Sequence, residues 1–396
     1  MRAADSEGED FALADQERLR RRLESLIGVP VTDGNDVDVL RNGAQIFPKM
    51  LDAIRGAETS VDLLTYVYWS GWPAEAFADA LADRAASGRR VRVLVDAVGG
   101  ARMDRALIAR MQDAGVDARF FRPPWLRSPF VHNHRTHRKV LVVDGTEAFT
   151  GGVGIAHEWD GDARSPEEWR DTQIHVRGPA VSGLMAAFAQ NWSEVAGAPD
   201  QPGDPYVALP AAGDDAIQVV RGTATVGWDD MQSAWYTLVT AATERITLQT
   251  AYFAPDESFL ELLVCAATAG VRVQLLLPGP HYDKTVSRWG SERYYDTLLA
   301  AGIEVWRYQP TMLHTKIATI DGQVAMIGSS NYNRRSLDHD EEVACIVLGG
   351  AGPARLLSDF ERDLQRSERV DAAAWRARGM GQRLAEQATR PVSRFL

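Results

Sequence analysis

The sequence predicts an α/β protein built from two similar halves, each an α/β sandwich with helices around a mixed central sheet. Two observations lead to this prediction. Short β-branched runs such as "RVRVLVD" alternate with stretches of helical spacing such as "PAEAFADALADRAAS". The same series of segments then returns roughly 180 residues later, a distance that matches the usual size of one domain.

Three pairs of segments define the repeat, and each pair keeps its place in the order of the chain. The matching segments are 60–71 with 245–256, 87–100 with 269–281, and 114–126 with 301–313. Repetition at a fixed period indicates one structural unit used twice. In both halves the strand-like runs at 90–96 and 271–278 neighbour helical stretches that would cover them.

Composition marks the expected boundaries, because the stretch 197–215 is rich in Pro, Gly and Asp. Leu19, Leu23 and Leu26 fall on one side of an amphipathic N-terminal helix, which we expect to pack against the body of the protein. The predicted parts are an N-terminal helical segment at 1–37, a first half at 38–196, a linker at 197–215, and a second half at 216–396 ending in a surface helix.

The bulk composition narrows the function class. Hydrophobic residues make up 45% of the chain, which predicts a packed core, and the net charge of -11 is unfavourable for a nucleic-acid partner. Cys265 and Cys345 each lie in an apolar run and predict buried thiols instead of a disulfide. We find no signal peptide and no apolar run of about 18 residues, so we expect a cytoplasmic protein with peripheral membrane contact at most.

Lysine usage draws attention to two short motifs. Only four of the 43 basic residues are lysines, and two of them follow a histidine by two residues, in "HRKVLVVD" and "HTKIATID". Nearly all other basic positions of the chain carry arginine. The lysines at 139 and 316 therefore indicate that these two positions need a compact ammonium group. Residues i and i+2 of a strand point the same way, so each lysine shares a face with His137 or His314.

Each motif continues into a tight turn and a returning strand. The Asp-Gly pairs at 144–145 and 321–322 are strong turn signals, and the returning strands bring small residues, with Asn331 in the second half, back beside the histidines. A histidine, a lysine, an amide and a close backbone approach suit a phosphate group. The aspartates lie at the far end of a flat hairpin, so a turn-forming role competes there with a catalytic one.

The duplicated H-x-K-x4-D motif resembles that of the phospholipase D superfamily, over nearly the whole chain. Within it, "GAQIFPKMLDAIRGAETSVDLLTYVYWSG", "EWRDTQIHVRGPAV" and "PGPHYDKTVSRWG" resemble the bacterial cardiolipin synthase branch. The resemblance implies two halves related by a pseudo-twofold axis, with one active site at their interface. It also implies a phosphohistidine intermediate, phosphatidylglycerol or a similar phospholipid as substrate, a small alcohol or water as acceptor, and no cofactor or metal.

The resemblance also implies roles for individual residues. By this resemblance His137 is the nucleophile and His314 the general acid and base, although the two motifs are nearly symmetric. The expected catalytic residues are His137, Lys139, Asp144, His314, Lys316 and Asp321. The expected phosphate-binding residues are Asn331, Ser329 and Gly152, and the acids expected to orient the histidines are Asp171 and Glu342.

One position departs from the family pattern, since Gly154 stands where the family carries an asparagine. His134 and His157 are nearby candidates to compensate, although surface or packing roles are commoner for such histidines. Two other functions stay open: a nuclease or phosphodiesterase on the same scaffold, and a catalytically impaired binding or scaffold homologue.

Four further features have both a functional and a structural interpretation. The run "HNHRTH" at 132–137 could hold a metal, but the family interpretation explains its last histidine better. The stretch 123–130, Trp69 and Trp72 could contact acyl chains or a membrane, and core packing or loop stapling is the favoured alternative for each.

Overall fold

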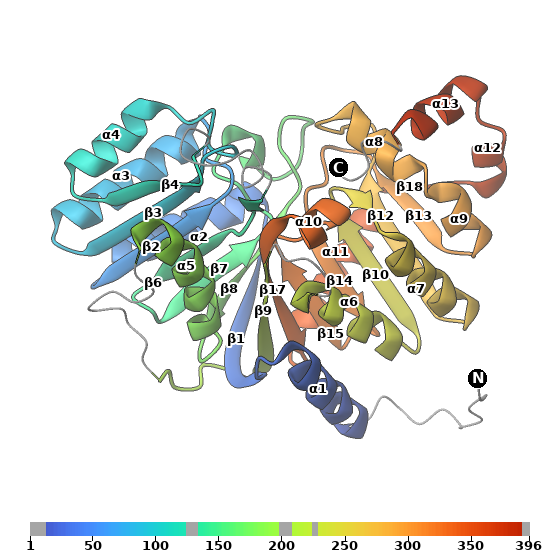
Figure 1. Ribbon diagram of the computed structural model, residues 1–396, viewed down its shortest axis with the longest axis horizontal. Coiled ribbons are helices and arrows are strands. Elements are labelled where there is room, and N and C mark those ends of the chain that lie inside the picture. The colour runs from blue at the N-terminus through green and yellow to red at the C-terminus, as the bar shows by residue number, and fades with distance from the viewer. Residues whose placement is uncertain (1–12, 124–133, 198–207, 224–228, 390–396) are drawn as a thin grey trace.

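The computed structural model describes residues 13–123, 134–197, 208–223 and 229–389 of the chain. Within these ranges the strands form one continuous sheet of sixteen strands with helices on both faces (Figure 1). A separate two-stranded sheet joins β11 (Phe253–Ala254) and β16 (Tyr332–Asn333) in parallel. The α/β class predicted from the sequence is therefore confirmed.

The first half supplies one wing of the sheet, in the spatial order β4-β3-β2-β6-β7-β8-β1. Its parallel strands β2, β3 and β4 carry the β-branched runs that predicted buried strands. In chain order the first half contains β1 (Thr32–Arg41), α2 (Asn42–Gly56), β2 (Ser60–Thr65), α3 (Trp72–Ala86), β3 (Arg90–Asp96), α4 (Arg105–Asp113), β4 (Asp117–Phe121), β5 (Arg135–Thr136), β6 (Val140–Val143), β7 (Glu147–Gly151), η1 (His157–Trp159), β8 (Thr172–Arg177) and α5 (Val181–Ala196).

The second half repeats this order as β13-β12-β10-β14-β15-β17-β9, with β18 added at the outer edge. Its parallel strands are β10, β12 and β13. The elements are β9 (Asp215–Gly222), α6 (Asp230–Ala241), β10 (Arg245–Thr250), α7 (Glu257–Thr268), β12 (Arg272–Pro278), α8 (Thr285–Glu292), α9 (Tyr295–Ala300), β13 (Glu304–Tyr308), β14 (Lys316–Ile320), β15 (Val324–Gly328), α10 (Arg334–Asp338), β17 (Asp340–Leu348), α11 (Gly352–Leu364), β18 (Ser367–Arg369), α12 (Ala372–Arg376) and α13 (Met380–Ala388).

The two wings join where β1 pairs with β9 in antiparallel fashion, so the halves share one sheet. This junction moves the predicted boundaries, because β1 begins at Thr32 inside the expected N-terminal segment and β9 begins at Asp215, the last residue of the expected linker. Around the junction, α5 and α11 pack on a shared core that includes Phe188 and Leu356. Helix α11, the C-terminal helix expected at the surface, buries one face, which includes Leu356 and Phe360, and leaves its other face exposed.

The N-terminal helix α1 (Leu13–Ile27) packs on the second half, where Leu19, Leu23 and Ile27 belong to the same core as α6. Packing against the body was expected, but Leu26 is 53% exposed and Ile27 takes its place on the buried face. The prediction that both thiols are buried is confirmed for Cys345, which lies in β17. It is wrong for Cys265, which is exposed on α7. Among the helices in the described ranges, none is long and apolar enough to cross a membrane.

Candidate active site

Two hairpins, β6–β7 and β14–β15, bring the motif residues to the junction of the halves. Val140 pairs with Thr150 and Ile317 with Ile327, so Lys139 and Lys316 lie at the open ends of their hairpins, as the turn signals predicted. Both histidines lie just outside the strands, His137 between β5 and β6 and His314 two residues before the start of β14.

The backbone of each motif is bound to the opposite half. Strand β5 pairs in parallel with β17, and the N–H of His137 donates to the carbonyl oxygen of Glu341 at 2.9 Å. In the other direction, the N–H of His314 donates to the carbonyl oxygen of Arg170 at 2.7 Å. These crossed contacts hold the two histidines at one interface although they are far apart in sequence.

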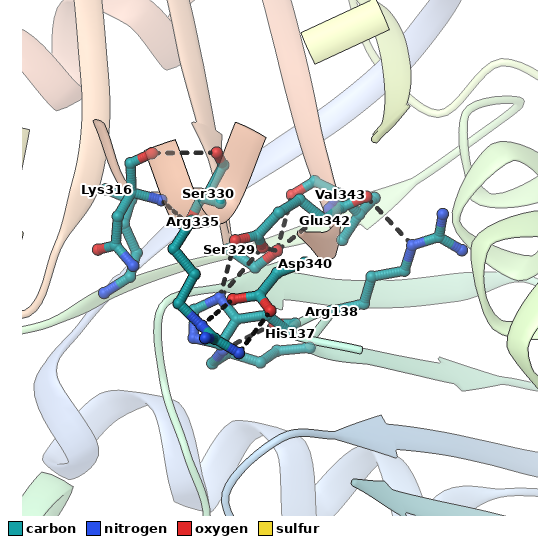
Figure 2. Close-up of polar contacts among 12 residues, drawn as sticks. His137, Arg138, Lys316, Ser329, Ser330, Arg335, Asp340, Glu342 and Val343 are labelled. Atoms are coloured by element: carbon teal, nitrogen blue, oxygen red, sulfur yellow. Dashed lines mark hydrogen bonds and ion pairs between the residues drawn. The ribbon is translucent and has the colours of Figure 1, made fainter. Parts of the chain in front are cut away.

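The histidine-orienting acids follow the same crossed arrangement. Nδ1 of His137 lies 3.0 and 3.1 Å from the two carboxylate oxygens of Glu342, and Figure 2 shows the contact between this carboxylate and the ring as dashed lines. Nδ1 of His314 lies 2.8 Å from Oδ2 of Asp171. A carboxylate accepts only, so each Nδ1 carries the proton and each Nε2 keeps its lone pair. The structure thus places both predicted acids on the histidine of the other half.

Each carboxylate is itself held in place by donors. The Ser329 hydroxyl donates to Oε2 of Glu342, as Figure 2 shows. Trp159 Nε1 donates to Oδ2 of Asp171 at 2.9 Å, and the N–H of Thr172 donates to Oδ1 at 2.8 Å. These donors fix both acids, and the acids in turn fix the orientation of both imidazole rings.

Both histidines open onto one cavity of about 800 Å³ between the halves. Its lining includes His137 and Lys139 from the first half, and His314 and Asn331 from the second. Oδ1 of Asn331 is buried and lacks a partner among the described residues, so this side chain has hydrogen-bonding capacity left for a ligand.

The lysines lie against the histidines. Lys139 Nζ donates to the carbonyl oxygen of His137 at 2.8 Å, and Lys316 Nζ donates to that of His314. Lys316 Nζ also lies 3.0 Å from Nδ1 of His314, but that nitrogen already gives its proton to Asp171. The ammonium therefore rests against the imidazole edge and is available to an anion.

Burial sets the protonation state of the two imidazoles. It lowers the pKa of His137 to about 4, with Glu342 opposing the shift and Lys139 adding to it. Burial likewise lowers the pKa of His314 to about 3, with Lys316 adding to the shift and Asp171 opposing it. Both imidazoles are therefore neutral at pH 7, which is the form that can attack phosphorus.

The same desolvation acts on the two lysines. It lowers the pKa of Lys139 to about 8, against the pull of Glu342, and that of Lys316 to about 7, against the pull of Asp171. Burial would raise the pKa of both acids, yet His314 keeps that of Asp171 low and His137 keeps that of Glu342 low. Two ammonium groups that lose stability on burial favour an anion in the cavity between them.

Asp144 and Asp321 lie at the opposite ends of the hairpins from the histidines. Asp144 accepts the N–H groups of residues 58–60 and the Thr59 hydroxyl, at 2.8 to 2.9 Å. Asp321 binds residues 243–245 in the same way, at 2.7 to 2.9 Å. Seven residues of extended chain span about 20 Å, so these carboxylates act on the turn and not on the reacting atoms.

Two of the three residues expected to bind phosphate have other neighbours. Ser329 is fully buried and gives its hydroxyl proton to Glu342. A Cβ added at Gly152, the equivalent position in the first half, would lie 2.3 Å from Oδ1 of Asp171. Both positions therefore serve the orienting acids: serine supports Glu342, and the missing side chain of glycine leaves room for Asp171. Of the three, Asn331 alone lines the cavity.

Gly154 departs from the family pattern because its space is already filled. A Cβ there would meet Cβ of Val67 at 2.8 Å and the Trp159 ring at 3.1 Å. The Trp159 indole that fills this space also donates to Asp171, whereas in the second half the Ser329 hydroxyl donates to Glu342. His134 and His157 are not among the cavity-lining residues.

Several residues that shape the site were missed at the level of sequence. Arg170 binds Asp363 on α11 at 3.0 Å, which anchors the backbone beside Asp171. Arg335 holds Asp340 with two contacts of 3.1 Å, and both line the cavity near His137 (Figure 2). Arg170 is buried and its partner is 193 residues away, so no local pattern could have identified that pair. Arg335 and Asp340 are only five residues apart, but they lie outside both histidine motifs.

The metal interpretation of "HNHRTH" falls partly outside the described residues, because 132 and 133 are not described. His134 contacts the carbonyl oxygen of His339 at 3.3 Å, and His137 contacts Glu342. Within the described part of the chain, no group of three or more His, Cys, Asp or Glu side chains could hold a metal ion. Of the possible membrane contacts, 124–130 also lie outside the described residues.

Two similar halves that meet over paired His-x-Lys motifs define a phospholipase D-like fold. A solved structure of phosphatidylserine synthase from Haemophilus influenzae Rd KW20 shares this fold, with a TM-score of 0.73 and 13% identity, over 96% of this chain and 100% of that one. The family model described as "Cardiolipin synthase, PLD-like domain" matches residues 50–159 and 236–364, so each match contains one histidine motif.

Curated relatives agree with the family model. The chain is 31% identical to the cardiolipin synthase of Geobacillus kaustophilus (strain HTA426), over 98% of this chain and 78% of the relative. It is 30% identical to cardiolipin synthase 2 of Bacillus anthracis, over 96% of this chain and 74% of the relative. The chain belongs to the cardiolipin synthase family of phospholipase D-like proteins.

Proposed function

We propose that this protein transfers a phosphatidyl group from one phospholipid to an alcohol, and that two phosphatidylglycerol molecules are converted to cardiolipin and glycerol. The observation that carries the proposal is the crossed pair of carboxylates. Each acid fixes the histidine of the other half with its Nε2 unprotonated, and both histidines line one cavity. Membership in the cardiolipin synthase family supports this choice of substrate.

The proposed reaction has two steps at one phosphorus atom. In the first, Nε2 of one neutral histidine forms a bond to phosphorus while the bond from phosphorus to the headgroup oxygen breaks. The other histidine gives its proton to the departing alkoxide. In the second, that histidine takes the proton of an incoming alcohol, whose oxygen displaces the phosphohistidine nitrogen. Water in place of the alcohol gives hydrolysis. Following the family resemblance, we assign the nucleophile to His137 and the acid and base to His314.

The charges in the cavity fit these steps. The acid needs a proton at the start, although burial alone lowers the pKa of His314. A bound phosphodiester brings a negative charge beside it and so favours the imidazolium form. Lys139, Lys316 and the side-chain amide N–H group of Asn331 are the donors placed to hold the non-bridging oxygens, and the lysines offset charge that develops in the transition state.

Lipid mass spectrometry tests the proposal. Purified protein is incubated with phosphatidylglycerol, with and without a second alcohol, alongside His137→Ala and His314→Ala. We expect cardiolipin and glycerol from the natural sequence, a new phosphatidyl-alcohol when a second alcohol is added, and no product from either variant. Product formation that is unchanged in one of the variants would remove the two-histidine mechanism.

A further inference from the structure

The mouth of the cavity carries exposed apolar side chains from both halves. Val98, in the segment after β3, is 48% exposed, and Val286, on α8 after β12, is 38% exposed. Both line the cavity that contains the two histidines. Large apolar side chains on opposite sides of a cavity mouth indicate a surface that meets another apolar phase.

A wall of tryptophan rings continues from this rim to the reacting centre. Trp69 Nε1 donates to the carbonyl oxygen of Gly99, next to Val98, at 2.6 Å. The Trp69 ring lies 6.1 Å from that of Trp159, which lies 5.1 Å from the ring of His314. Near His137 the lining includes charged side chains, Lys139, Arg335 and Asp340, together with Tyr66, whose ring lies 5.0 Å from that of His137. The tryptophan rings therefore form an apolar path from the mouth of the cavity to His314. Such a path suits the acyl chains of a lipid whose phosphate lies at the histidines.

Cations flank the mouth. Arg102 and Lys284 are exposed and line the cavity, and the Arg102 guanidinium lies 4.6 Å over the Trp69 ring. The nearby acid Asp283 accepts the hydroxyl proton of Tyr252 at 2.6 Å, which ties its carboxylate to the protein. Exposed cations beside apolar side chains match the interface of a bilayer that contains anionic lipid.

Helix α13 carries two further exposed apolar side chains. Met380 is 78% exposed and Leu384, one turn later, is 65% exposed, so both lie on the same side of this helix. Gln382 Nε2 donates to Oε2 of Glu292 at 3.3 Å and joins α13 to α8, the helix that carries Val286. Figure 1 shows α8 and α13 at the upper edge of the molecule, with α1 at the lower edge.

We propose that this rim docks on the surface of a phospholipid bilayer that contains anionic lipid. Its apolar and cationic members are Val98, Arg102, Lys284, Val286, Met380 and Leu384. A lipid then enters the cavity along the tryptophan wall without leaving the bilayer completely. The inference rests on the proposed function, because only a bilayer-resident phosphodiester needs this path. A water-soluble substrate would gain nothing from exposed valines at the mouth.

Flotation with vesicles tests the docking surface directly. Vesicles of phosphatidylglycerol with phosphatidylcholine are compared with vesicles of phosphatidylcholine alone. We expect Val98→Asp with Val286→Asp to weaken binding at least tenfold, since an inserted apolar group contributes about 0.8 kcal/mol per buried CH₂. Lys284→Gln should weaken binding to the anionic vesicles by about fivefold, the equivalent of about 1 kcal/mol per cation.

Leu26→Asp is the matched control, because Leu26 is 53% exposed but lies on α1. It should bind vesicles like the natural sequence. Equal binding by the valine double variant and the natural sequence would overturn the docking surface. So would a loss of binding in Leu26→Asp that matches the loss in the rim variants, since contact would then involve α1.

A second readout separates docking from chemistry. Met380→Ser with Leu384→Ser should lose activity on vesicles and keep it on a dispersed short-chain phosphatidylglycerol below its micelle concentration. Equal losses on both substrates, with the fold intact, would overturn the docking role of α13. A third outcome is that neither the natural sequence nor any variant acts on either substrate, while the rim substitutions still weaken vesicle binding. That result would contradict the proposed function and leave the docking surface supported.

Discussion

The substitution Asp171→Asn isolates the role of the crossed carboxylates. The amide that replaces the carboxylate could keep an oxygen for the Trp159 and Thr172 donors, but its NH₂ group would then face Nδ1 of His314. Two donors cannot share that contact, so the imidazole would move its proton to Nε2. The histidine would then present a proton to the cavity where the incoming alcohol needs an acceptor.

The size of the effect follows from the contact that is lost. The Asp171 carboxylate is fully buried and His314 is 6% exposed, so their charge-assisted hydrogen bond is worth about 2–3 kcal/mol in the transition state. The wrong tautomer adds to this, and the precedent of catalytic triads suggests a combined loss of about 10³-fold or more in the transfer rate. The fold should lose less than about 2 kcal/mol, because the amide oxygen keeps its donors.

The assay is single-turnover transfer from phosphatidylglycerol, measured together with thermal unfolding. Asp144→Asn is the matched control, since it makes the same chemical change in a carboxylate that binds only turn residues. We expect this control to lose about 1–3 kcal/mol of stability and to keep its transfer rate. A transfer rate within about threefold of the natural sequence in Asp171→Asn, or an equal loss in folded Asp144→Asn, would refute the reasoning.

Three further predictions follow from the site and the core. The profile of kcat against pH should rise through about 4, where the nucleophile His137 loses its proton while the bound phosphodiester keeps His314 protonated. It should fall above about 7 to 8, where the lysines lose their protons, and a rise centred near 6.5 would contradict the role of burial. Gly154→Asn should lower stability by about 1–3 kcal/mol and fail to raise the transfer rate, because Val67 and Trp159 fill that space, as unfolding and rate measurements would show. Leu23→Ala should destabilise the fold by about 2–5 kcal/mol in urea unfolding, and a change below about 0.5 kcal/mol would mean that α1 is not part of the second core.

Local features of the sequence predicted the hairpins well. The Asp-Gly turns fix the register of β6–β7 and β14–β15, and the two-residue spacing puts each lysine on the side of its histidine. Each of these relations spans fewer than about 20 residues, a range over which turn chemistry determines the backbone. The repeated segments also indicated both wings of the sheet, because each β-branched run reappears in the same order.

The crossed arrangement could not be read in the same way. His137 and Glu342 are 205 residues apart, and His314 and Asp171 are 143 apart. Family resemblance selected both acids, but their assignment to histidines depends on the pairing of β5 with β17 and on the contact between residues 170 and 314. Nothing in either local sequence specifies those contacts.

Side-chain environments were the least predictable feature. An apolar run on a helix does not show which face is buried, so the sequence pattern puts Cys265 and Leu26 inside although both are exposed. Ser329 is predicted to bind phosphate because it follows the motif in sequence. In the structure its hydroxyl donates to the buried Glu342 carboxylate instead. From the sequence, Gly154 indicates the loss of a phosphate-binding asparagine. The structure shows that the Trp159 ring occupies the space that an asparagine side chain would need.

The central claim is that histidines from the two halves act on one phosphorus atom. A crystal structure of the protein with orthovanadate, which adopts the five-coordinate geometry of phosphoryl transfer, tests it most directly. We expect one vanadium atom bonded to Nε2 of His137, with an oxygen within hydrogen-bond distance of Nε2 of His314 and two further oxygens on Lys139 and Lys316. Vanadate bound to one histidine alone, with the other imidazole too distant to reach it, would contradict the account.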